Sequence, residues 1–113
     1  MARAPTTIDA FNAVAELSRR NLLSALGTGE LTVGELVGRL GLSQPQVSKH
    51  LGVLRAVDLV QVRTDGRHRR YRVNGPALKP IHEWVRTFER TWNARLDRLD
   101  DLLEELKSQE NAP

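Results

Sequence analysis

The spacing of apolar residues predicts four short helices before residue 57, because apolar side chains return every three or four positions. In chain order these positions are Ile8, Phe11 and Val14, then Leu22, Leu23 and Leu26, then Val33, Leu36, Val37 and Leu40, and finally Val47, Leu51, Leu54 and Val57. Thr32 and Glu35 have the spacing of a capping box, and Gly41 can adopt the left-handed conformation that ends a helix. The third and fourth helices therefore form a candidate helix-turn-helix.

The fourth helix, within residues 42–59, carries polar groups that differ from the Glu/Lys mixture of an ordinary solvated surface. Ser43 can cap its start, and Pro45 fits its first turn. The exposed side then shows amides, a hydroxyl and cations, at Gln44, Gln46, Ser48, Lys49 and Arg55. Because such side chains can hydrogen-bond base edges in the DNA major groove, this helix is a candidate recognition helix.

After residue 57 the apolar period becomes alternating, which predicts a two-stranded hairpin with Asp65-Gly66 as its turn. The inward-facing positions are Val60, Val62, Tyr71 and Val73. Six basic residues fall within ten positions, namely Arg63, Arg67, His68, Arg69, Arg70 and Arg72. A basic hairpin directly after a helix-turn-helix predicts a DNA-binding wing. A charged hairpin that is merely solvated is the less favoured alternative.

Residues 76–107 are expected to form a long C-terminal helix, which begins between the two prolines at 76 and 80. Its apolar stripe steps by four or three residues through Trp84, Phe88, Trp92, Leu96, Leu99, Leu103 and Leu106. This stripe offers more apolar surface than a small core can cover, and monomers avoid such patches. We therefore predict a dimerisation helix, with a helix folded back on its own domain as the alternative.

The predicted homodimer forms through the first and last helices. The expected interface residues are Ile8, Phe11, Val14, Trp84, Phe88, Trp92, Leu96, Leu99 and Leu103. A two-fold axis would present two recognition helices to successive major grooves, about 34–36 Å apart. The expected target is therefore an inverted repeat whose half-sites are centred about 10 bp apart.

The composition is that of one domain, spanning residues 1–113, and its charge is unevenly distributed. Residues 1–75 carry a formal charge of +5 and residues 76–113 of −2, within a net charge of +3. A basic front predicts a polyanionic partner. The chain lacks cysteine, a nucleophile motif, a paired carboxylate site and a glycine-rich phosphate loop, so an enzyme is not expected. No apolar run is long enough to span a membrane, and we expect a cytoplasmic protein.

A metal site and a cofactor are also not expected. His82 and Glu83 are consecutive, so their side chains diverge by about 100° on a helix and cannot ligate one ion together.

The DNA interface predicted from the sequence divides into two sets. The base-reading residues are Gln44, Gln46, Ser48 and Lys49, and the residues expected on the DNA backbone are Ser43, His50, Arg55, Arg63, Arg67, His68, Arg69 and Arg70.

Two segments, SQPQVSKHLGVLRAVDLV and GRHRRYRV, resemble the recognition helix and wing of ArsR-type winged-helix repressors, and AELSRRNLLSAL is similar to their second helix. The resemblance covers nearly the whole chain. It implies a mainly α fold with a two-stranded hairpin, and a homodimeric, sequence-specific transcriptional repressor that often acts on its own operon. A protein-interaction module that uses the apolar C-terminal helix is the alternative.

The chain departs from the family's metal sensors at the third helix. Those members carry a Cys-Val-Cys element where this chain has Thr32-Val33-Gly34, so the thiolate site is absent. The long, Trp-rich last helix resembles the metal-independent branch. The resemblance does not identify a small-molecule effector, and whether one exists stays open.

Overall fold

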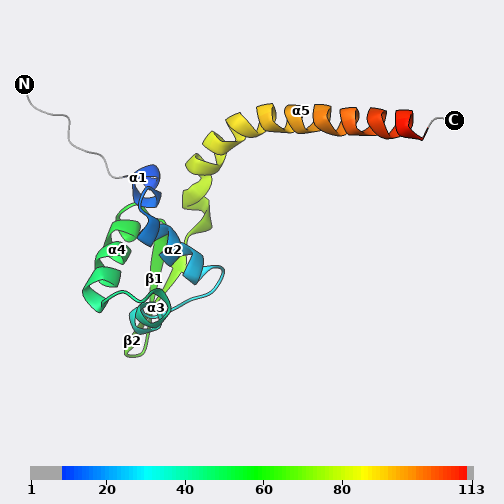
Figure 1. Cartoon of the computed structure of the whole chain (residues 1–113). Helices are drawn as coiled ribbons and strands as arrows, with labels where there is room; N and C mark the ends of the chain where they lie inside the picture. Colours follow the sequence, from blue (N-terminus) through cyan, green and yellow to red (C-terminus); the bar gives the residue numbers. More distant parts are fainter. Residues whose placement is uncertain (1–8, 112–113) are drawn as a thin grey trace, which may run out of the picture. The chain divides into compact units, whose positions relative to one another are not determined.

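The computed structural model describes residues 9–111 and divides into two compact units, one up to residue 80 and one from residue 81, which are described separately. The elements are α1 (Ala10–Val14), α2 (Leu17–Leu26), α3 (Val33–Leu40), α4 (Gln44–Ala56), β1 (Val60–Asp65), β2 (His68–Val73), the 3₁₀ helix η1 (Gly75–Leu78) and α5 (Lys79–Glu110) (Figure 1). The predicted mainly α fold with one two-stranded hairpin is confirmed. The prediction of a single domain stays a prediction.

The core of the first unit lies where α2, α3, α4 and the hairpin meet. Its buried side chains are Ala13, Leu22, Leu26, Leu31, Leu36, Val47, Leu51, Leu54, Leu59, Val60 and Tyr71. Burying an aliphatic side chain of this kind stabilises the fold by about 1.5–3 kcal/mol relative to leaving it exposed. The helical periodicity predicted most of these positions, whereas Leu31 and Leu59 lie outside the helices and follow from tertiary packing.

The helix-turn-helix is defined by two capping boxes and one glycine. In α3, Thr32 Oγ1 accepts from the Glu35 N–H, and the Glu35 carboxylate accepts from the Thr32 N–H. Gly41 ends α3 at φ +67°, as the left-handed stop requires. Ser43 then begins α4 with a second capping box. These local signals specify the start of the candidate recognition helix through residues close to one another in the sequence.

The first helix is short, and two arginines of α2 hold its C-terminal end. Arg19 donates to the carbonyls of Ala13 (2.6 Å) and Asn12 (3.1 Å), and Arg20 donates to the carbonyl of Val14 (2.8 Å). The last carbonyls of a helix lack partners within it, so these cations complete them. Asp9 caps the start of α1, where its carboxylate accepts from the Asn12 N–H at 2.9 Å.

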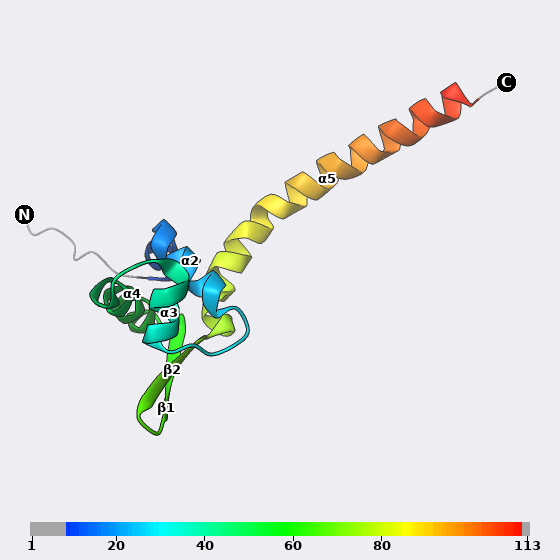
Figure 2. The ribbon, with the colours of Figure 1, turned by 60° about the horizontal axis from the view of Figure 1, so that its bottom comes forward.

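The hairpin projects beyond the helices of its unit (Figure 2). Val60 pairs with Val73 and Val62 with Tyr71, so the predicted inward positions share one face. Leu31 extends the pairing on the other side of β2 through two backbone hydrogen bonds with Tyr71, of 3.0 and 2.8 Å. The predicted turn is wrong by one residue. Asp65 pairs with His68, and the turn residues are Gly66, at φ +60°, and Arg67.

Helix α4 ends in a Schellman motif whose left-handed position is occupied by an aspartate. Leu59 N–H donates to the Leu54 carbonyl and Asp58 N–H to the Arg55 carbonyl, both at 3.0 Å. Asp58 has φ +61°, and it is the one non-glycine residue between 9 and 111 with a positive φ. This backbone conformation is unfavourable for a residue with a Cβ.

Replacement of Asp58 by glycine is expected to raise the free energy of unfolding by about 0.5–1 kcal/mol, because glycine adopts this conformation without steric cost. Urea denaturation followed by circular dichroism measures the change. Asp58→Ala is the control, because it removes the carboxylate but keeps the Cβ. An equal gain from both substitutions would contradict the backbone explanation.

The second unit is the long helix. Helix α5 starts at Lys79, between the two prolines as predicted, because Gly75–Leu78 form a 3₁₀ turn that accommodates Pro76, and Pro80 lies in the first α-helical turn. It ends at Glu110, three residues later than predicted. The rings of Trp84 and Phe88 form an edge-to-face contact with centroids 5.2 Å apart. Within residues 9–111, no helix has the length and apolar character required to cross a membrane.

Candidate nucleic-acid interface

Helix α4 separates its core residues from its polar residues. Val47, Leu51 and Leu54 are buried, and they occupy one side of the helix. The exposed residues include the predicted base-reading and backbone-contacting side chains Gln44, Gln46, Ser48, Lys49 and Arg55. The polar face is therefore presented to solvent by a helix whose other side is fixed in the core.

One predicted base-reading side chain also has a structural role. Gln46 Oε1 accepts from the Ser43 N–H (2.9 Å), and Ser43 Oγ accepts from the Gln46 N–H (3.3 Å). A bidentate contact between glutamine and adenine uses both the oxygen and the amide nitrogen. While the cap is intact, one lone pair of Gln46 Oε1 is used by the Ser43 N–H, so the amide nitrogen is the group that is fully available for such a contact. Gln44 has no such role in the cap, and it keeps its full amide group.

His50 lies away from the exposed polar face. Its side chain is only 12% exposed, and Nε2 is 3.5 Å from Glu16 Oε1, in the connection between α1 and α2. Nδ1 is buried and has no hydrogen-bond partner among the described residues. Glu16 also accepts from Arg19 at 2.7 Å. The structure thus places His50 at the junction of α4 with the first two helices, and its contact with the DNA backbone stays a prediction.

The hairpin arginines divide into paired and unpaired groups. Arg63 donates to both oxygens of Glu30, each at 3.1 Å. Arg70 donates to Asp65 (2.9 Å) and lies 3.9 Å from a Glu35 oxygen. In contrast, the side chains of the tip residues Arg67, His68 and Arg69 are exposed and have no hydrogen bond or ion pair within the described part of the chain. Arg72 is intermediate between these groups, because its guanidinium hydrogen-bonds the neutral Gln61 at 3.2 Å.

The ion pairs lower the pKa values of Glu30, which lies beside the hairpin, and of Asp65 at the end of β1. The pKa of Glu30 is below its ordinary value mainly because Arg63 hydrogen-bonds its charged form, and Arg70 has the same effect on the pKa of Asp65. A lowered folded-state pKa means that each pair contributes to stability above the ordinary carboxyl pKa. The contribution is lost as the pH falls through the lowered value. The pairs are therefore formed at neutral pH.

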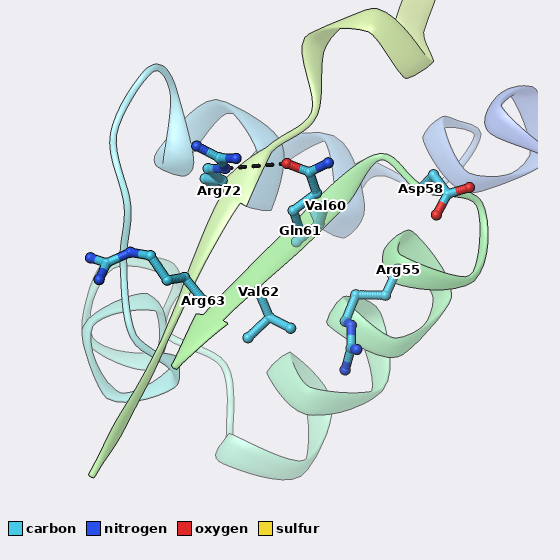
Figure 3. Close-up of a pocket in the computed structure, with 7 residues that line it drawn as sticks. All are labelled: Arg55, Asp58, Val60, Gln61, Val62, Arg63 and Arg72. Atoms are coloured by element: carbon cyan, nitrogen blue, oxygen red, sulfur yellow. Dashed lines mark hydrogen bonds between the residues drawn. The ribbon is translucent and has the colours of Figure 1, made fainter. Parts of the chain in front are cut away.

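Two open grooves flank the hairpin. One, of about 470 Å³, brings Ser48 of α4 together with the tip cations, and its lining comprises Thr32, Val33, Gly34, Ser48, Arg67, His68, Arg69 and Tyr71. The other, of about 570 Å³, lies between the end of α4 and β1. Figure 3 shows Arg55 and Val62 at this second groove, with Arg63 leaving β1 on the side away from Arg55. Ser48 of the recognition helix and the tip of the hairpin therefore line the same groove.

The hairpin carboxylates were missed as site residues by the sequence analysis. Glu35 was identified only as a capping residue and Asp65 only as a turn residue, and Glu30 was given no role. The pairing of Glu30 with Arg63 joins residues 33 positions apart, which no local period reveals. The alternation of side chains along the strands does place Arg63 and Arg70 on one face. Because two like charges on one face destabilise the pairing, their presence indicates that opposite charges lie nearby.

The predicted dimer residues are largely exposed, as an unpaired interface requires. In α1 Phe11 is 40% exposed, and in α5 Trp84, Phe88, Trp92, Leu96, Leu99 and Leu103 are all about half exposed. Val14 is half-buried, and Ile8 lies outside the described residues. Leu17, at the start of α2, is 61% exposed and was not among the predicted interface residues. Between residues 9 and 111 no cluster of His, Cys, Asp and Glu could hold a metal ion.

The fold and the exposed polar helix beside a basic hairpin define the class of winged helix-turn-helix DNA-binding proteins. The model of the bacterial regulatory proteins of the arsR family matches residues 18–62. An arsenic resistance transcriptional regulator of Pseudomonas putida is 32% identical over 96% of this chain and 92% of its own length. The chain belongs to the arsR family of bacterial regulatory proteins.

Two further proteins extend the comparison. A probable mercury resistance operon repressor of Streptomyces lividans is 40% identical over 67% of this chain, and the chain spans 61% of that relative's length. The crystal structure of a possible transcriptional regulator for arsenical resistance superposes with a TM-score of 0.64 at 36% identity, over 84% of this chain and 96% of that one. The predicted class of DNA-binding transcriptional repressor, and not enzyme, is confirmed by this family membership.

Proposed function

We propose that the protein represses transcription as a homodimer that binds an inverted-repeat operator, with α4 in the major groove and the hairpin tip on the flanking DNA backbone. The observation that carries this proposal is the location of exposed base-reading groups on α4 beside unpaired cations at the tip. Phosphate contacts give affinity and register, whereas base-edge contacts give sequence choice. A DNA partner also implies a cytoplasmic location.

We assign sequence recognition to the exposed face near the start of α4. Gln44 carries an amide that can pair bidentately with adenine, and Lys49 can reach guanine. Gln46 contributes one further hydrogen bond through its amide nitrogen while its oxygen caps the helix. Ser48 borders the groove with the tip cations, so it can contact either a base edge or the adjacent phosphate. Ser43 and Arg55 are assigned to phosphate contacts.

We assign dimerisation to the apolar stripe of α5, together with Phe11 and Leu17 of the first unit. From Trp92 onward the stripe steps 4-3-4-3 through Leu106, which is the repeat of helices that pack along an apolar seam. Two half-sites about 10 bp apart then follow from the two-fold symmetry. We propose a regulator without a metal cofactor, since Thr32-Val33-Gly34 supplies no thiolate. The same stripe would serve the alternative function, a scaffold that binds a different protein.

Gln44→Ala and Lys49→Ala are expected to remove discrimination between the operator and a duplex mutated at the contacted base pair. The expected loss is about 1–3 kcal/mol for each side chain, or roughly 5- to 150-fold in the affinity ratio. The operator is first located by footprinting on the DNA upstream of the protein's own gene. Affinities for both duplexes are then measured at one salt concentration by a mobility-shift titration.

Gln109→Ala, which removes an exposed amide from the last turn of α5, is the matched control and should leave the ratio unchanged. Equal weakening on the operator and on the mutated duplex by Gln44→Ala would contradict the base-reading role. A native protein that binds no duplex at low salt, but captures a second protein through α5, would favour the scaffold alternative.

A further inference from the structure

Three carboxylates lie on or beside the hairpin although its proposed partner is a polyanion. They are Glu30, Glu35 and Asp65. A negative charge close to a DNA-binding surface opposes binding through long-range repulsion. The presence of these carboxylates at a DNA-binding surface therefore needs a structural explanation. The pairing of the two strands provides one, because it places two arginines opposite each other.

The strand register creates a like-charge contact in the body of the hairpin. Arg63 lies directly opposite Arg70. Side chains of directly opposed residues share one face, with Cβ atoms about 4.5–5.5 Å apart, and two like charges at this distance destabilise the pairing. An isolated two-stranded hairpin is only marginally stable. The body of this hairpin therefore depends on counter-charges for its conformation.

Glu30 provides the first counter-charge from a fixed position. It directly precedes Leu31, whose backbone forms two hydrogen bonds with Tyr71 of β2. Its carboxylate binds the Arg63 guanidinium of β1 through two hydrogen bonds of 3.1 Å. A bidentate pair fixes the direction of a guanidinium as well as its distance. The Glu30 contact therefore connects the edge segment at Leu31 to the far strand of the hairpin.

Arg70 is held from two directions. Asp65, at the end of β1, accepts from its Nε at 2.9 Å. Glu35 approaches its guanidinium at 3.9 Å while the same carboxylate completes the capping box with Thr32. The second contact joins the first turn of α3 to β2. Arg70 thus links the end of the first strand to the helix-turn-helix.

We infer that Glu30, Glu35 and Asp65 are positioning residues for DNA binding: they hold Arg63 and Arg70 on the body of the hairpin and so fix the direction in which Arg67, His68 and Arg69 project. The inference rests on the wing role proposed above. It has a counter-intuitive consequence, because removal of a negative charge beside the DNA should weaken binding.

The test exchanges the charges of the best-defined pair. Glu30→Gln, Arg63→Gln and the double variant Glu30→Arg with Arg63→Glu are compared with the native protein on one operator duplex and one unrelated duplex. Glu30→Gln is expected to weaken binding to both duplexes about three- to fivefold. The exchanged pair keeps the native net charge, so it should recover most of the affinity that Glu30→Gln loses.

Asp58→Asn is the matched control, because it removes an exposed carboxylate that forms no ion pair among the described residues, and asparagine tolerates a positive φ. This control should bind as tightly as the native protein or slightly more tightly. Glu35→Gln is a second variant that keeps the capping box, since glutamine also fits it, and it should weaken binding in the same direction as Glu30→Gln.

The salt dependence separates a displaced tip from a partly unfolded protein. A displaced tip lowers the slope of log K against log salt by about 0.9 for each lost phosphate contact. Partial unfolding would lower the active fraction, with the slope unchanged, and would overturn the inference. Tighter binding by Glu30→Gln, as for Asp58→Asn, would also overturn it. If Arg67→Ala weakens binding while Glu30→Gln does not, the wing role stands and only this inference fails.

Discussion

Leu99→Glu is expected to convert the protein from dimer to monomer and to abolish high-affinity operator binding. Leu99 lies at the middle of the α5 stripe and is 51% exposed. In a two-fold interface the substitution introduces two charges into apolar surroundings, where an unpaired charge is strongly unfavourable. A monomer binds a single half-site, whereas the two linked recognition helices of a dimer bind both half-sites together. Loss of this bivalent binding lowers the affinity by about 10²- to 10⁴-fold.

Sedimentation equilibrium measures the mass, and a mobility-shift titration measures the affinity in the same buffer. Ala94→Glu is the control, because residue 94 lies five positions from residue 99 and so about 140° around the helix, away from the stripe. It should leave both properties unchanged. If the Leu99→Glu variant keeps the dimer mass, the interface does not include this stripe. If the native protein is itself a monomer, the stripe serves another partner.

The second large effect is expected from the tip of the hairpin. The double variant Arg67→Ala with Arg69→Ala should weaken binding to every duplex alike, by roughly tenfold or more in moderate salt. Both side chains are exposed and unpaired among the described residues, so no internal contact is lost. Each phosphate contact contributes about 0.9 to the slope of log K against log salt, and the slope should therefore fall by about 1.8.

The matched control is Arg86→Ala with Arg90→Ala, which removes the same charge from two exposed positions of α5. Its slope should stay close to the native value. Affinities for the operator and for an unrelated duplex are measured between 50 and 200 mM salt. A loss confined to the operator would assign base recognition to the tip, and it would contradict the division of roles between α4 and the hairpin.

The sequence predicted most of what is specified locally. The capping box at Thr32, the cap at Ser43 and the stop at Gly41 specify the helix-turn-helix, and each of these signals is confirmed. The turn was placed one residue early because both Asp65-Gly66 and Gly66-Arg67 offer a glycine for a two-residue turn. The strand register, which depends on inward packing of Val62 against its neighbours, selects the second.

Properties that depend on tertiary contacts could not be predicted from the sequence. The position of His50 on α4 borders the polar face, and only the packing of the α1–α2 connection reveals that the side chain is buried against Glu16. The hairpin arginines look equivalent in the sequence, yet contacts with Glu30 and Asp65 separate the paired from the unpaired. Their assignment to DNA contact stays a prediction, as does the dimer interface.

The division of α4 into a buried and an exposed side has a consequence for how such a protein acquires new targets. Val47, Leu51 and Leu54 secure the helix, while none of the proposed base-reading groups contributes to the core. On the proposed assignment of base recognition to α4, exchange of Gln44, Ser48 and Lys49 would change the preferred operator without removing a core contact. Gene duplication followed by drift at a few surface codons would be enough to give a regulator with a separate set of promoters.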